Sequence, residues 1–149
     1  MKGRLVIGLL VATVALLLTW KFSQYTERPA ALLQASADGD SALADTLLRR
    51  GTSPMVRDGW QSTPLMYAAG NGHLGTVTLL LSRGADVNEP SRGGRTPLMW
   101  AAASGRDDIV RVLLDAGASP SVVDPKGKTA LTYAAPGLSE GTLARLRAR

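Results

Sequence analysis

The sequence predicts an all-α protein: an α-helical solenoid of about four helix-turn-helix repeats with projecting loops, preceded by one N-terminal apolar helix. The repeats are indicated by a motif that begins at Thr63, Thr96 and Thr129, at steps of 33 residues. It reads Thr-Pro-Leu-Met-Tyr-Ala-Ala, then Thr-Pro-Leu-Met-Trp-Ala-Ala, then Thr-Ala-Leu-Thr-Tyr-Ala-Ala. Self-similarity at a fixed period is typical of stacked repeats. The apolar helix is indicated by the run from Leu5 to Trp20, which contains no charged residue.

The apolar run predicts a signal anchor, a transmembrane helix within residues 1–22. As a helix, the run spans roughly 24 Å at about 1.5 Å per residue, and Phe22 and Tyr25 extend it toward the ~30 Å of a bilayer core. Because the run opens the chain as an export signal does, we expect a single-pass protein of the inner (cell) membrane with its repeat domain on the periplasmic side. The alternative is a secreted or periplasmic protein after signal cleavage, although residues 19–22 offer no small-x-small cleavage site and cleavage near Ala35-Ser36-Ala37 would cut through the first repeat.

One face of the predicted membrane helix carries small residues. They are Gly8, Ala12, Ala15 and Thr19. Small residues on one face allow close helix–helix packing in lipid. The other interpretation is that such residues are simply common in apolar segments.

The repeat domain is expected over residues 30–149, after a polar linker at residues 23–29. In a typical repeat, Thr63 caps the first helix and Pro64 occupies its first position, where the missing N–H costs nothing. Gly72 turns the chain, and Gly84 ends the second helix in a left-handed conformation. The four repeats are expected at about 30–58, 59–91, 92–124 and 125–149.

The order of these residues, Thr-Pro-Leu, Ala-Ala, Gly, Leu-Leu and Gly-Ala, resembles the ankyrin repeat family over about Ala30 to Arg149. The resemblance implies a protein that binds other proteins through its loop tips and through the concave face formed by the first helices. The partner-binding positions that it implies on the tips are Trp60, Arg92, Arg95, Lys126 and Lys128. Those on the concave side are Asn71 and Ser104, and an aromatic ladder adds Tyr67, Trp100 and Tyr133. The ladder is also explained by packing between repeats.

Composition excludes several classes of function. Residues 23–144 hold 11 Lys or Arg and 12 Asp or Glu, a net charge of −1, so the repeat domain is not a nucleic-acid-binding body. The chain has no cysteine, and its single histidine, His73, cannot form a zinc site alone. No nucleophile–base pair, phosphate loop or metal cluster is recognisable, so we expect no catalytic activity, no cofactor and no small-molecule substrate.

The sequence therefore predicts a membrane-tethered interaction module. An exposed tryptophan beside a row of basic side chains suits an acidic protein surface. We expect the partner to be an exported protein, with this chain as an accessory, protective or inhibitory factor for an enzyme. The alternative is an assembly subunit of a membrane complex whose main contact is the transmembrane helix.

Overall fold

The computed structural model describes residue 14 and residues 27–148. The predicted transmembrane helix and its proposed packing positions, Gly8, Ala12, Ala15 and Thr19, lie outside the described residues. Among the helices that are described, none has both the length and the apolar character that crossing a membrane requires.

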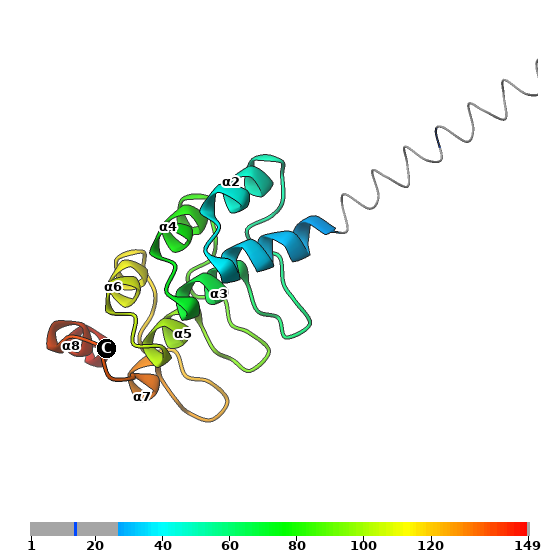
Figure 1. The fold of residues 1–149 in the computed structure, drawn as a ribbon. Helices are drawn as coiled ribbons and strands as arrows, with labels where there is room; N and C mark the ends of the chain where they lie inside the picture. Colours follow the sequence, from blue (N-terminus) through cyan, green and yellow to red (C-terminus); the bar gives the residue numbers. More distant parts are fainter. Residues whose placement is uncertain (1–13, 15–26, 149) are drawn as a thin grey trace, which may run out of the picture.

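The described part of the chain is all-helical and contains no strand. A helix at 27–38 pairs with α2 (Ser41–Arg49), and three further pairs follow. These pairs are α3 (Pro64–Asn71) with α4 (Leu74–Ser82), α5 (Pro97–Ala103) with α6 (Asp107–Asp115), and α7 (Ala130–Tyr133) with α8 (Glu140–Arg147). The pairs stack in chain order, and the connecting loops project together from one side of the stack (Figure 1).

The first helix of the domain is longer than the sequence suggested. It includes residues 27–29, which were expected to belong to the linker. Glu27 and Arg28 are good helix formers, and Pro29 does not interrupt the helix. The buried positions begin further along, at Leu32 and Ala35.

Threonine caps and glycine turns set the helix boundaries as predicted. The Thr63 hydroxyl accepts a hydrogen bond from the Met66 N–H at 3.4 Å, and Pro64 occupies the first turn of α3. After α4, Gly84 adopts a φ of 84°, and the Ala85 N–H donates to the Leu80 carbonyl at 3.0 Å. This closing pattern satisfies carbonyls that the helix end leaves without partners.

The core lies between stacked repeats. Leu65, Leu80, Leu98 and Leu113 are completely buried. The paired alanines of α3 and α5 are also buried, and their small side chains allow these neighbouring first helices to approach closely.

The last repeat departs from the pattern, because its first helix, α7, covers only four residues. Pro136 is the cause: it has no N–H to donate, and it disfavours a helical conformation at the preceding residue. The Ala135 N–H instead donates to the Ala102 carbonyl of α5 at 2.9 Å. The last repeat therefore stays attached to the stack through the backbone even where its helix ends early.

Candidate interaction surface

Three equivalent loops precede α3, α5 and α7, and we call them the first loop (58–62), the middle loop (91–95) and the last loop (124–128). All three share a backbone framework in which the N–H of the fourth residue donates to the carbonyl of the first, at 2.9 to 3.0 Å. The repeats therefore hold these loops in matched positions, and differences between the loops lie in their side chains.

The first and last loops are each built around an aspartate. In the first loop, Asp58 Oδ1 accepts hydrogen bonds from the N–H groups of Trp60 (2.8 Å) and Ser62 (2.9 Å). In the last loop, Asp124 Oδ1 accepts from the equivalent N–H groups at 2.8 and 2.9 Å. A carboxylate that accepts from the loop backbone in this way fixes the turn.

The second carboxylate oxygen of each aspartate binds the aromatic ladder. The Tyr67 hydroxyl donates to Asp58 Oδ2 at 2.6 Å, and the Tyr133 hydroxyl donates to Asp124 Oδ2 at 2.5 Å. Burial acts to raise the pKa of Asp58, but the hydrogen bonds from Tyr67, Ser62 and Trp60 outweigh it and lower that pKa. The hydrogen bond from Tyr133, followed by the Lys128 N–H, lowers the pKa of Asp124. Both aspartates are therefore ionised at neutral pH, and their charges are held inside the loops.

The middle loop lacks this arrangement. Ser91 stands where the other loops carry aspartate, and Trp100 stands where the other repeats carry tyrosine. Within the described residues, the Ser91 hydroxyl forms no hydrogen bond, and the buried Nε1 of Trp100 has no hydrogen-bond partner. The middle loop and its aromatic side chain are thus not joined by a side-chain hydrogen bond.

A pocket of about 410 Å³ lies between the first and middle loops. Its lining combines tip and ladder residues: Trp60, Ser62, Tyr67, Ser91, Arg92, Gly93 and Trp100. The two loops are joined at this pocket by the Arg92 N–H, which donates to the Trp60 carbonyl at 2.9 Å. The Trp60 side chain remains 72% exposed, whereas the rings of Tyr67 and Trp100 pack together with centroids 6.0 Å apart. An exposed indole at the mouth and a packed aromatic floor make a surface suited to protein contacts.

The basic side chains of the tips are in two different states. Arg95 lies over the Tyr133 ring at 4.4 Å from its centroid, and Lys128 lies over the same ring at 5.4 Å. Cation–π contacts of this length hold both cations against the last repeat. Arg92 and Lys126 are exposed, and neither has an ion pair within the part of the chain that the structure describes. These two cations are the ones free to meet a partner.

Asn71 and Ser104 lie at the opposite ends of α3 and α5 from the loops. The Asn71 side chain donates to the Ala37 carbonyl at 2.7 Å, and His73 Nε2 lies 2.9 Å from the same oxygen. Both side chains therefore hold the first helix of the domain to the second repeat. Ser104 is the exposed C-cap of α5. Neither position contributes to the pocket between the loops.

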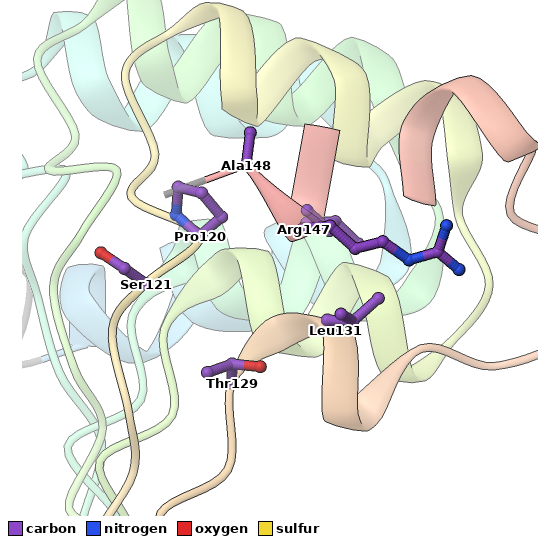
Figure 2. A pocket seen from close by; sticks show the side chains of 7 residues that line it. Pro120, Ser121, Thr129, Leu131, Arg147 and Ala148 are labelled. Carbon is purple, nitrogen blue, oxygen red and sulfur yellow. The ribbon is translucent and has the colours of Figure 1, made fainter. Parts of the chain in front are cut away.

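A second hollow, of about 360 Å³, lies at the C-terminal end of the stack. Figure 2 shows it between the loop after α6, the start of α7 and the end of α8, with Pro120, Leu131 and Ala148 around it. It includes none of the predicted partner-binding residues, and Arg147 is its one charged side chain. The pocket between the loops is therefore the stronger candidate for the interaction surface.

Comparison with protein families decides the identity of the fold. The family described as ankyrin repeats (3 copies) matches residues 32–124. The chain belongs to the ankyrin repeat family. No curated protein matches it. Ankyrin repeat proteins are typically non-enzymatic, and the repeats indicate a protein–protein interaction module. Across the described residues, no group of three or more His, Cys, Asp or Glu side chains is placed to hold a metal ion.

Sequence reasoning singled out neither Ser91 nor the two loop aspartates, Asp58 and Asp124. The oxygens of both aspartates are occupied by internal donors. The relevant pattern was available in the sequence at the 33-residue spacing, because aspartate accompanies tyrosine nine residues later and serine accompanies tryptophan.

Proposed function

We propose that this ankyrin repeat protein is a membrane-tethered module that binds an exported partner protein, as an accessory, protective or inhibitory factor for an enzyme. The pocket between the first and middle loops, with the exposed Trp60 at its mouth, is the observation that carries the proposal. The tether is the apolar run within residues 1–22, and the repeat domain is proposed to lie on the periplasmic side of the inner membrane.

Two features of the pocket support a protein partner with an acidic surface. A tryptophan that is 72% exposed at a loop tip keeps a large apolar area in water, and tryptophan is enriched among residues that dominate binding energy. Arg92, on the same rim, is a cation without an internal ion pair in the described structure. Together they combine an aromatic anchor with a charge that steers an acidic partner.

Site-specific photocrosslinking in intact cells tests this proposal. A benzophenone amino acid placed at position 60 of the full-length chain should capture one discrete partner, which mass spectrometry then identifies as an exported protein. The matched control places the same amino acid at Ser82, an exposed residue at the end of α4. In the position-60 background, Arg92→Glu should reduce capture, whereas Arg50→Glu, an exposed cation at the C-cap of α2, should not.

Capture that is equal at positions 60 and 82, or unaffected by Arg92→Glu, would contradict the loop surface as the binding site. A cytoplasmic partner would contradict the periplasmic location. Replacing residues 1–22 with an unrelated membrane anchor should preserve capture. Loss of capture in that variant would instead favour the assembly subunit, whose main contact is the transmembrane helix.

A further inference from the structure

We propose that the pocket between the first and middle loops receives a carboxylate side chain, an aspartate or glutamate on an exposed segment of the protein partner. The partner carboxylate would occupy the role that Asp58 and Asp124 play inside their own loops. This inference rests on the proposed function and names the chemical group that the loop surface recognises.

The three loops provide an internal comparison. In the first and last loops, one carboxylate accepts from two backbone N–H groups and from the aromatic hydroxyl of the same repeat. The equivalent donors of the middle repeat are the N–H groups of Gly93 and Arg95 and the indole N–H of Trp100. Within the described residues, none of these three donors is bound to Ser91, which is too short to bridge the loop and the ring. The middle loop therefore keeps the donor arrangement of its neighbours without the acceptor that they carry.

The orientation of Trp100 is consistent with an acceptor on the loop side of its ring. A Cβ at Gly70, near the far end of α3, would lie 3.0 Å from Trp100 Cε3. Because Cε3 and Nε1 are on opposite edges of an indole, the N–H edge faces away from Gly70. The Nε1 atom is shielded from solvent, so a hydrogen bond from it to a bound carboxylate requires the pocket wall to move.

The charges around the pocket favour an anion over a neutral amide. Arg92 lines the pocket and has no ion pair within the described residues. The nearest internal carboxylate in the lining loops, that of Asp58, already accepts hydrogen bonds from Trp60, Ser62 and Tyr67. Asp58 keeps its negative charge, but its oxygens are satisfied by these internal donors, and it forms no ion pair with Arg92 among the described residues. A volume of about 410 Å³ is at the small end of the roughly 300–1,000 Å³ of ligand pockets and suits one or two side chains.

The indole N–H resonances of the full-length protein in a mild detergent provide a direct test. The chain has three tryptophans, and ¹H–¹⁵N spectra separate Trp100 from Trp20 and Trp60. Titration with N-acetyl-aspartate amide should shift the Trp100 indole resonance to saturation. N-acetyl-asparagine amide, which has the same shape without the charge, should bind at least about tenfold more weakly. Arg92→Gln should weaken the response to the acid by a similar factor.

The matched variant is Ser91→Asp, which gives the middle loop the carboxylate that its neighbours have. It should abolish the response to the acid while leaving the thermal unfolding midpoint unchanged or higher. The proposal is overturned if the Trp100 resonance does not move with the acid, if acid and amide act equally, or if Ser91→Asp responds as the parent does.

Selection of displayed peptides on the same full-length protein separates this inference from the proposed function. Peptides that need Trp60, carry an acidic residue and fail to bind Ser91→Asp support both. Peptides that need Trp60 but show no acidic preference support the loop surface as the binding site and contradict the carboxylate pocket. Peptides that bind independently of Trp60 contradict the proposed surface, and the indole titration then decides the carboxylate pocket alone.

Discussion

Two glycines at equivalent positions, Gly94 in the middle loop and Gly127 in the last loop, allow backbone strain to be separated from steric overlap. Both have a φ of 72°, in the left-handed region that side chains with a Cβ rarely adopt. A Cβ at Gly127 would meet no other atom within 4 Å. A Cβ at Gly94 would lie 3.3 Å from Pro125 Cγ and would overlap Cδ of the same ring. Since the proline ring is closed onto the backbone nitrogen, it cannot rotate away.

The expected costs follow from these two situations. Alanine in the left-handed region costs about 1–2 kcal/mol, and a less flexible unfolded chain offsets about 0.4–1 kcal/mol of this. We therefore expect Gly127→Ala to lower the free energy of unfolding by about 1 kcal/mol. Gly94→Ala adds an overlap of the kind that costs about 1–3 kcal/mol, so its total should be about 2–4 kcal/mol.

Urea unfolding of the full-length protein in a mild detergent, followed by circular dichroism, measures both costs. Each variant should lower the urea midpoint without changing the slope of the transition. Equal destabilisation by the two replacements would refute the steric part of the reasoning. A stabilising Gly127→Ala would refute the strain part.

Four further predictions concern the first loop and the aspartate–tyrosine pairs of the first and last loops. Trp60→Ala should weaken partner binding at least about 30-fold, measured by titration, with an unchanged unfolding midpoint, because the side chain is 72% exposed. Gln61→Gly should raise the free energy of unfolding by about 0.5 kcal/mol in a urea titration, because Gln61 has a φ of 58°. Tyr67→Phe should lower it by about 1.5–3 kcal/mol, because a hydrogen bond to a charged acceptor is lost. The lowered pKa values of Asp58 and Asp124 mean that their stabilisation is present above pH ~4 and is lost as pH falls through the folded-state values. Unfolding midpoints measured at decreasing pH should fall because of this loss, and the fall should be smaller in Asp58→Asn.

Much of the fold could be predicted because its determinants are local and recur at 33 residues. Thr63 and Pro64 start a helix through their own conformational preferences, and Gly84 ends one through its φ. Such preferences are readable without knowing what packs against them. The early end of α7 is likewise a local effect of Pro136, although the repeat pattern continues through Ala134 and Ala135.

The candidate site was only partly predictable, because its residues interact across repeats. Nothing in the local sequence of Arg95 indicates that its guanidinium lies over Tyr133, since that contact depends on how two repeats stack. The same applies to Asn71, which binds the carbonyl of Ala37 in the preceding repeat. The exposure of Trp60 was predictable because it depends only on the position of the residue in a projecting loop.

Several unfavourable features gather around the pocket between the first and middle loops, although the buried hydroxyls of Thr52 and Thr76, which also lack partners in the described residues, lie elsewhere. The last loop uses every stabilising device of the repeat: an aspartate that fixes the turn, a tyrosine that binds it, and a glycine at the left-handed position. The same chain departs from this solution at Gln61, at Ser91, at the exposed Trp60 and at the buried N–H of Trp100. All four departures lie on or beside the pocket between the first and middle loops. Side chains around this pocket therefore lack contacts that the last loop has, which agrees with the proposed contact outside the chain.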